Sequence, residues 1–422
     1  MRKSIKVYLS FLLICAMTMN FTACTAKENL KVEEINLLDG INANKVGDKP
    51  LDEAFVTSCA DFSLKLFKKS ITENESSLIS PLSVMLALAM TANGADGQTR
   101  SEMEELLGGK IKLEELNEYL HTYIKYMPSD EKYKLQIANS IWLKDDENQF
   151  TVEKEFLQTN VNYYGAATYK SAFDKETIID INNWVKKNTD GMIDKIITKI
   201  DNRAVMYLIN TLVFNAEWEE VYREIAVHDG IFNAINGKLR TVKMMYSNEA
   251  SYIDTGKATG FIKQYKDSRY SFVALLPNND IEINEYIASL TGEDFFKAIS
   301  STEFARVDAA IPKFNSNYEI EMKDILSSLG MTTAFDINSA DFSKLGKSTS
   351  GKLFIGKVLH KTHITVNELG TKAGAVTLVE INDGSANVER KSVKLDRPFI
   401  YAIVDNRTNL PIFIGTVMDI ND

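Results

Sequence analysis

The segment Ala204–Phe214 constrains the fold of this chain more than any other. Its residues are almost continuously apolar, so both parities of a strand would be apolar. Such a strand is buried on both faces, and other layers must cover the sheet that contains it. The segment therefore predicts a central strand with covering layers on both sides.

The other periodic segments predict helices early in the chain and strands late. Ser80 and Pro81 form a helix start, with an N-cap followed by a first-turn proline, and Thr99 with Glu102 forms a capping box. Further strands are expected at Tyr270–Leu276, Arg306–Ile311, Leu353–Asn367, Pro398–Val404 and Pro411–Val417. Helices followed by strands predict an α+β fold with mostly antiparallel sheets. No linker or repeat interrupts residues 51–422, so we expect a single domain there.

The N-terminus has the pattern of an export signal. Met1–Lys6 is basic and Val7–Met19 is a short apolar run, which together are typical of a secretory signal peptide. The run ends in Phe21-Thr-Ala-Cys24, which resembles a bacterial lipobox, although Phe21 stands where leucine is usual. Cys24 would then be the lipidated first residue of the mature protein. Simple secretion is the alternative.

The export interpretation divides the chain into three parts. We expect a signal peptide at 1–23, a lipidated polar tether at 24–50 and the domain at 51–422. Of the three cysteines, Cys15 would leave with the signal and Cys24 would carry lipid, so Cys59 could form no internal disulfide. The expected location is the cell surface, as a lipoprotein, or the surrounding medium.

Charge and histidine content exclude several functional classes. The net charge is -10 without any basic block, which argues against nucleic-acid binding. Only four histidines occur, and His360 and His363 would point to opposite faces of their strand. Gly351–Val358 nearly spells a phosphate-binding loop but lacks its final Ser or Thr. We therefore expect no metal, no cofactor and no enzymatic activity.

The segment Gly370–Val376 is unusual because small residues directly follow a strong strand. A loop-like stretch, Leu378–Lys391, comes next. An ordinary long hairpin loop is one interpretation. The other is a strand waiting to form, because Thr371, Ala373 and Ala375 share one uncharged face. Small residues there would let the segment enter a sheet between two existing strands.

Motifs spread along the chain resemble those of the serpin family in their family order. They cover Leu51–Ile420 and include Leu78–Val84, Tyr163–Ala166, Ile181–Val185, Asn210–Trp218, Ile311–Phe314, Leu329–Phe335, Val366–Thr371, Leu395–Phe399 and Phe413–Gly415. The resemblance implies the serpin fold, in which helices surround a large, mostly antiparallel central sheet and an exposed reactive-centre loop. It also implies a suicide-substrate protease inhibitor, whose cleaved loop inserts into that sheet.

The resemblance assigns roles to residues that match the family's motifs. The hinge, where the inserting loop begins, would be Glu368, Gly370, Thr371, Ala373, Gly374 and Ala375. The shutter, a polar cluster that hydrogen-bonds beneath the opening strands, would be Ser80, Ser83, Asn210 and His360. The breach, at the top of the main sheet, would be marked by Trp218. Val376 and Lys372 depart from the family pattern. Lys372 would lie on the outward face, where a charge is tolerated.

The scissile bond follows from the same resemblance by counting along the loop. Counting forward from Glu368 places it at Gly384–Ser385, and counting backward from Pro398 places it at Asn387–Val388. Glycine at the cleaved position favours elastase-like or subtilisin-like serine proteases as partners. Arg390 would suit a trypsin-like enzyme but lies too far along. We expect a monomer that reaches membranes only through its N-terminal lipid.

A non-inhibitory serpin that acts as a binding or chaperone-like protein is the competing interpretation. Bulky residues or prolines in the hinge would block insertion. The segment Gly370–Ala375 contains neither. The hinge composition therefore favours inhibition.

Overall fold

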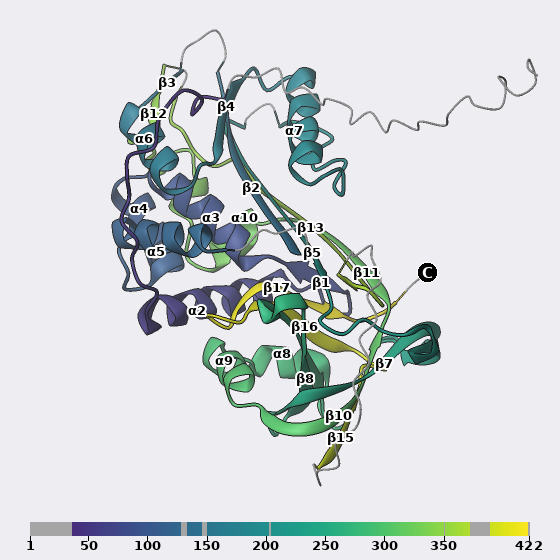
Figure 1. The fold of residues 1–422 in the computed structure, drawn as a ribbon. Helices are drawn as coiled ribbons and strands as arrows, with labels where there is room; N and C mark the ends of the chain where they lie inside the picture. The colour runs from purple at the N-terminus through teal and green to yellow at the C-terminus, as the bar shows by residue number, and fades with distance from the viewer. Residues whose placement is uncertain are drawn as a thin grey trace, which may run out of the picture. The chain divides into compact units, whose positions relative to one another are not determined.

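A computed structural model of the chain describes residues 36–127, 133–145, 150–201, 204–349, 351–371 and 389–420. These residues fall within one compact unit, Val32–Asp422 (Figure 1). The helices are α2 (Glu53–Ser70), α3 (Pro81–Ala92), α4 (Gly97–Gly108), α5 (Leu113–Lys125), α6 (Lys154–Tyr163), α7 (Lys175–Asn188), α8 (Ile283–Ser289), α9 (Gly292–Ser300) and α10 (Lys323–Ser328). Short 3-10 turns are η1 (Glu224–Ala226), η2 (Lys266–Ser268) and η3 (Thr333–Phe335).

The strands form three sheets in the described ranges. The six-stranded sheet has the order β11 (Phe314–Glu321), β13 (Lys357–Asn367), β14 (Gly370–Thr371), β5 (Met206–Glu217), β2 (Tyr133–Lys144) and β4 (Ala167–Ser171). The nine-stranded sheet joins β1 (Ser77–Ile79), β17 (Leu410–Val417), β16 (Phe399–Asp405), β9 (Tyr270–Pro277), β8 (Ala258–Gln264), β7 (Leu239–Asp254), β10 (Glu303–Pro312) and β15 (Arg390–Lys394), with β6 (Val227–Asn233) paired to β7. β12 (Gly346–Ser348) pairs with β3 (Phe150–Val152).

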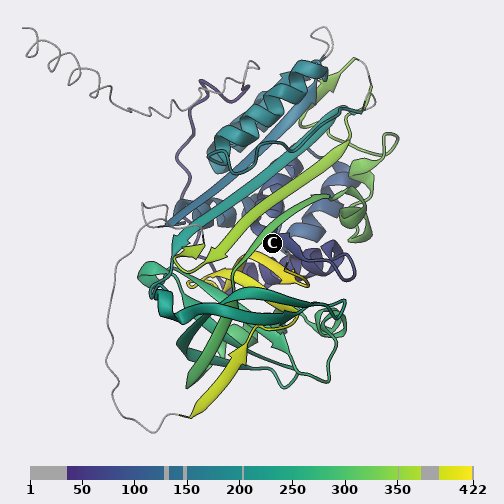
Figure 2. The ribbon, with the colours of Figure 1, turned by 90° about the vertical axis from the view of Figure 1, so that its right-hand side faces the viewer.

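The six-stranded sheet is covered on both faces, as the apolar run predicted. Every residue of β5 from Met206 to Phe214 is buried. On one face, Ile181 and Trp184 of α7 pack against Trp142 of β2 and its neighbours. On the other face lies α3, all of whose residues are buried. Figure 2 shows α7 running across the front of the long strands, with the early helices behind them.

The six-stranded sheet is mixed rather than uniformly antiparallel. β13 runs parallel to β5, and β2 runs parallel to β4. The remaining neighbours in this sheet are antiparallel. The α+β class and the helices around a large sheet are confirmed, and the parallel β13–β5 pair is the feature that positions the site.

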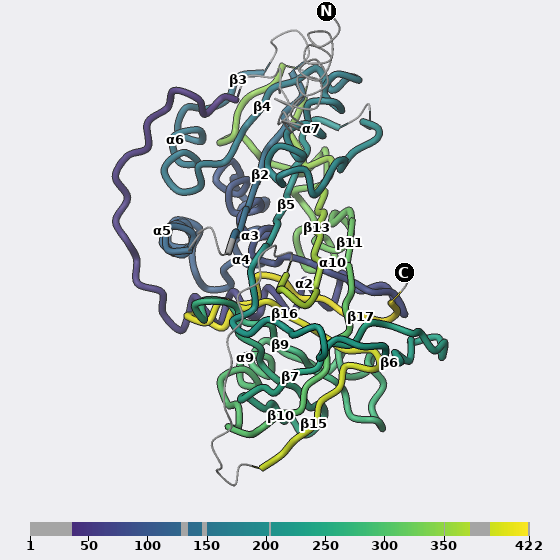
Figure 3. Tube along the Cα trace, turned by 45° about the vertical axis from the view of Figure 1, so that its right-hand side comes forward, coloured from purple at the N-terminus to yellow at the C-terminus, as the bar shows by residue number. Residues whose placement is uncertain are grey.

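The described part of the expected tether, residues 36–50, makes specific contacts with the domain. Asn36 forms a bridge with Tyr169 of β4, the edge strand of the six-stranded sheet. The Leu37 amide donates to the Thr168 carbonyl at 2.7 Å, and Leu38 is buried. Figure 3 shows the segment passing beside α6 and α5 to reach α2. Edge contacts of this kind were not visible in its polar composition.

Two local predictions were wrong. The expected capping box at Thr99 lies inside α4, which begins at Gly97, and Glu102 instead accepts hydrogen bonds from the Thr332 and Thr333 amides, both at 2.8 Å. The Glu102 carboxylate, which the local pattern assigned to the start of the helix, is therefore used in a tertiary contact instead. The strand expected from Leu353 begins only at Lys357.

No helix among the described residues is long and apolar enough to cross a membrane.

Candidate functional site

The site lies between the two central strands β5 and β13. From Lys357 to His363, β13 pairs directly and in parallel with Tyr207 to Val213 of β5. Beyond this point, the two-residue strand β14 lies between them. It pairs antiparallel with β13 on one side and antiparallel with β5 on the other. β5 and β13 are thus paired directly along one stretch and separated by β14 at the end of that stretch.

Gly370 is required by the close approach of β14 to β5. Its φ is 150°, and a Cβ on this residue would lie 2.1 Å from the Ala216 carbonyl oxygen. Side chains avoid both that conformation and that distance. The Asn367 side chain shapes the preceding turn, because its Oδ1 accepts the Leu369 amide at 2.9 Å and the Gly370 amide at 3.2 Å.

Thr371 is fully buried in the space between the strands. Its hydroxyl shares a hydrogen bond of 2.6 Å with the Tyr265 hydroxyl. Thr371 also lies opposite Val366 of β13 and Ala216 of β5. The inward orientation that sequence parity predicted for Thr371 is therefore present in the structure.

Glu368 lies at the turn and forms an ion pair with Lys313 at 2.6 Å. The hydrogen bond from Lys313 lowers the pKa of the Glu368 carboxyl. Both side chains are about one-third exposed, 35% for Lys313 and 38% for Glu368, so the pair contributes little to stability.

Trp218 lies directly against the turn that leads into β14. Its indole Nε1–H donates to the Asn367 carbonyl at 2.9 Å, and its backbone amide donates to the Leu369 carbonyl at 3.0 Å. The ring stacks on Tyr265 with centroids 4.4 Å apart. Trp218 therefore holds the residues on either side of Glu368, at the end where the strands part.

The four residues assigned to the shutter meet under the joined stretch, and all are buried. His360 Nε2 accepts the Ser80 amide at 3.1 Å, which leaves the proton on Nδ1 to be donated to Asn210 Oδ1 at 2.5 Å. The Asn210 amide donates to Ser83 Oγ at 2.6 Å and to Asn139 Oδ1 at 2.5 Å. Burial lowers the pKa of His360 to about 3, so the ring is neutral near pH 7.

His363 lies on the opposite face of β13, as predicted, and contacts Asn317 Oδ1. Several partners in the site were missed from the sequence: Tyr265, Asn139, Lys313, Tyr222, whose amide donates to the Glu368 carbonyl, and Lys263, whose ammonium lies over the Trp218 ring. A weak signal existed for Lys263, because a charged residue stands at a position of the β8 segment that strand alternation would turn inward.

Some expected site residues fall outside the described residues. They are Cys24, Ala373, Gly374, Ala375, Gly384, Ser385, Asn387 and Val388. The described residues end at Thr371 and begin again at Glu389. Arg390 belongs to β15 and pairs with Asp308 at 2.6 Å, so it is part of a strand.

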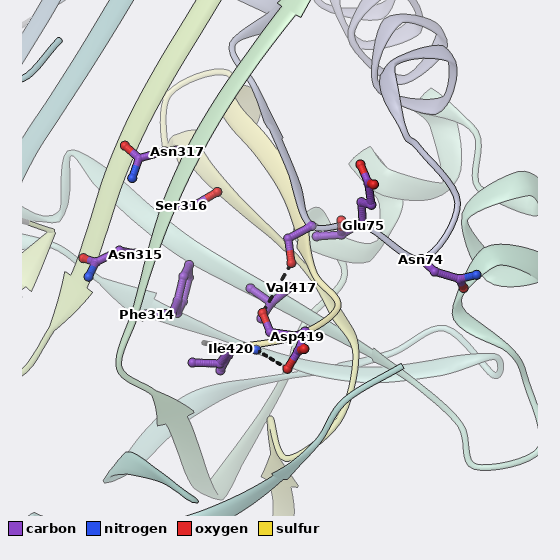
Figure 4. Close-up of a pocket in the computed structure, with 11 residues that line it drawn as sticks. Asn74, Glu75, Phe314, Asn315, Ser316, Asn317, Val417, Asp419 and Ile420 are labelled. Atoms are coloured by element: carbon purple, nitrogen blue, oxygen red, sulfur yellow. Dashed lines mark hydrogen bonds between the residues drawn. The ribbon is translucent and has the colours of Figure 1, made fainter. Parts of the chain in front are cut away.

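A separate pocket of 390 Å³ lies near the chain's C-terminal end, lined by residues of β11, β17 and the turn before β1. Phe314, Val417 and Ile420 contribute its apolar wall (Figure 4). Its Asp419 carboxylate is held by Arg240 and by the Ile420 amide. This polar group is therefore already engaged. Among the described residues, no group of three or more His, Cys, Asp or Glu could hold a metal ion.

Comparison with known proteins identifies the class. The family model described as Serpin (serine protease inhibitor) matches residues 57–420. Neuroserpin of Homo sapiens is 28% identical over 381 residues, covering 85% of this chain and 90% of neuroserpin. An uncharacterised serpin-like protein of Methanosarcina mazei is 28% identical over 429 residues, covering 96% of both chains.

Solved structures agree with the sequence comparisons. The thermophilic serpin tengpin in its native state has a TM-score of 0.89 and 55% identity, covering 92% of this chain and 100% of tengpin. Tengpin in its latent state has a TM-score of 0.80 at the same identity, covering 89% of this chain. The chain belongs to the serpin family. Serpins are in general inhibitors of proteases rather than catalytic enzymes.

Proposed function

We propose that this protein is a suicide-substrate inhibitor of serine-type proteases, and that it also accepts cysteine proteases. The observation that carries the proposal is β14, whose two residues already lie between β5 and β13. A chain that enters a sheet in this way supplies the first rung of a new central strand. Continued insertion after cleavage is the step that a suicide substrate requires.

The register of β14 defines what continued insertion would do. Val366 faces Thr371 on one side and Ala216 faces it on the other. Extended in the same register, Ala373 would meet Ile364 and Phe214, and Ala375 would meet Thr362 and Leu212. Strand geometry would turn these small side chains to the same buried face as Thr371.

The same register would bring Thr377 between His360 and Asn210. Insertion must break the hydrogen bond between those two side chains, and a buried polar group left unpaired costs about 1–3 kcal/mol. A threonine hydroxyl can both donate and accept. We propose that Thr377 replaces the bond that its own insertion breaks.

The chemistry comes from the protease. Its nucleophile attacks the carbonyl of the scissile bond, the acyl-enzyme forms, and the amine of the next residue leaves. Insertion then moves the bound enzyme and distorts its oxyanion hole. Loss of one oxyanion donor costs about 10²–10³ in rate, which stalls deacylation.

The driving force comes from replacing one parallel pairing with two antiparallel ones. About ten new ladder hydrogen bonds at ~1 kcal/mol net each amount to an order of 10 kcal/mol. The uncleaved state would then be held kinetically. Tengpin, at 55% identity, has been solved in both a native and a latent state, which supports two arrangements for such a chain.

We place the scissile bond at Gly384–Ser385, with Asn387–Val388 as the alternative, and propose elastase-like or subtilisin-like targets. The test mixes the mature protein with serine and cysteine proteases and looks for complexes that survive SDS. Mass spectrometry of the released C-terminal peptide identifies the bond. Cleavage without a stable complex for every protease would contradict inhibition and favour a non-inhibitory binding or chaperone-like serpin.

We also propose export, with residues 1–23 as the signal, Cys24 as the lipidated residue, and a single monomeric domain beyond residue 50. Metabolic labelling with a radioactive fatty acid tests lipidation. Label on the wild type and none on Cys24→Ser is the expected result. An unlabelled wild type found in the medium would indicate simple secretion instead.

A further inference from the structure

Lys263 is a charged side chain buried beside the hinge. It lies on β8 and is 3% exposed. Its Nζ is 2.9 Å from Glu249 Oε1, and Glu249 on β7 also accepts the Ser247 hydroxyl at 2.6 Å. The charge is thus paired, and the pair is almost wholly removed from water.

The Lys263 ammonium also lies against two aromatic rings. It is 4.6 Å from the centroid of the Tyr222 ring and 5.5 Å from that of Trp218. A cation over an aromatic ring is attracted by the ring's quadrupole, and the attraction strengthens when water is excluded. Lys263 therefore interacts with both rings and with the carboxylate.

These two aromatic residues hold the turn that precedes β14. The Trp218 indole and amide donate to the Asn367 and Leu369 carbonyls. The Tyr222 amide donates to the Glu368 carbonyl at 3.0 Å. Three consecutive carbonyls of the turn thus accept hydrogen bonds from the segment that Lys263 contacts.

Stability alone does not explain a buried ion pair at this place. Replacing such a pair with apolar groups of similar volume is often neutral for folding, because desolvation offsets the attraction. We infer that Lys263, paired with Glu249, is a positioning residue that keeps Gly370 and Thr371 seated between β5 and β13. The consequence for inhibition rests on the proposed function. If Gly370 and Thr371 are already paired with β5 and β13, the rest of the loop can insert in the correct register.

Hydrogen exchange on the intact protein tests this inference without any protease. In K263M/E249Q, which removes both charges, the Gly370 and Thr371 amides should exchange about tenfold faster or more, because two desolvated cation–π contacts are lost. E249Q leaves the buried ammonium without its anionic partner, which destabilises the site by a route of its own. Lys263→Met alone leaves Glu249 without its cation, so the double variant decides if the single variant fails to fold.

The matched control is R240M/D419N. It removes another ion pair, Arg240 with Asp419, which lies next to the turn between β6 and β7. Its β14 amides should exchange as in the wild type. Unchanged β14 exchange in K263M/E249Q would overturn the inference. So would an equal increase in β10 and β15, which would indicate general destabilisation.

A second readout separates this inference from the proposed function. If a protease forms SDS-stable complexes, K263M/E249Q should need more inhibitor per enzyme trapped, because more cleaved loops fail to insert in time. If the wild type traps no protease, the proposed function fails. The exchange experiment still decides whether Lys263 seats the hinge.

Discussion

The two ends of the boundary between strands β5 and β13 are stabilised in different ways. At one end, β14 separates the strands, and aromatic stacking with backbone hydrogen bonds surrounds it. At the other, the strands pair directly over the buried His360–Asn210 cluster. Stacked rings tolerate small shifts, whereas a buried hydrogen-bond network must keep its partners. If the loop inserts as proposed, we expect opening to start at the Trp218 end and to be resisted at His360.

The largest effect is expected for Thr371→Arg, at the end where β14 separates the strands. It should lower the yield of SDS-stable complexes by about 100-fold or more, because burying an unpaired guanidinium costs several kcal/mol. The protein should then be cleaved as a substrate, which gel analysis with the same protease measures. Lys372→Arg is the control, since that position is expected to face outward. Undiminished trapping by Thr371→Arg would show that the hinge is elsewhere.

The next test uses two glycines with similar backbones and different surroundings. Gly370 and Gly351 have φ of 150° and 140°, but of the two only Gly370 would bring an added methyl group within 4 Å of other atoms. Gly370→Ala should lower the free energy of unfolding by about 2–4 kcal/mol through strain plus overlap with Ala216. Gly351→Ala should lower it by about 1 kcal/mol through strain alone. Equal losses in chemical denaturation would mean that β14 does not approach β5 closely.

The buried end predicts a pH effect. Burial lowers the pKa of His360 from 6.5 to about 3, so between those values the unfolded chain binds a proton that the folded chain does not. Stability should therefore fall as pH decreases below about 6.5, by up to ~1.4 kcal/mol per pH unit until about pH 3. Unfolding curves across this range measure the slope.

His360→Gln separates this contribution from that of the carboxylates. The variant keeps an acceptor and a donor but does not titrate, so its stability should fall less steeply with acid than that of the wild type. His363→Gln, on the opposite face of β13, should keep the wild-type slope. Identical slopes for His360→Gln and the wild type would contradict a buried neutral ring.

The smallest effect is expected at the Glu368–Lys313 pair. Both groups are about one-third exposed, 38% and 35%, so Glu368→Gln should cost at most about 1 kcal/mol. The loss should shrink further at high salt, because exposed charges are screened. Chemical denaturation at low and high salt measures both. A loss larger than that of Gly370→Ala would mean that the ion pair, rather than the seated strand, holds this end.

Much of the fold followed from local patterns. Parity and hydrophobicity correctly described β5 as buried on both faces, placed His360 and His363 on opposite faces, and turned Thr371 inward. These properties depend on the residues and on strand geometry alone, so a sequence is sufficient to predict them. The capping box at Thr99 failed because Glu102 found partners more than two hundred positions away, at Thr332 and Thr333.

The sequence by itself determined that a small-residue segment follows a strong strand, and the resemblance to serpins named the polar residues of the His360 cluster. Only the tertiary structure decided that two residues of this segment are already seated, that Tyr265 receives Thr371, and that Lys263 lies under Trp218 and Tyr222. The physical reason is that periodicity specifies which way a side chain points. The partner it meets depends on how strands distant in the chain are brought together.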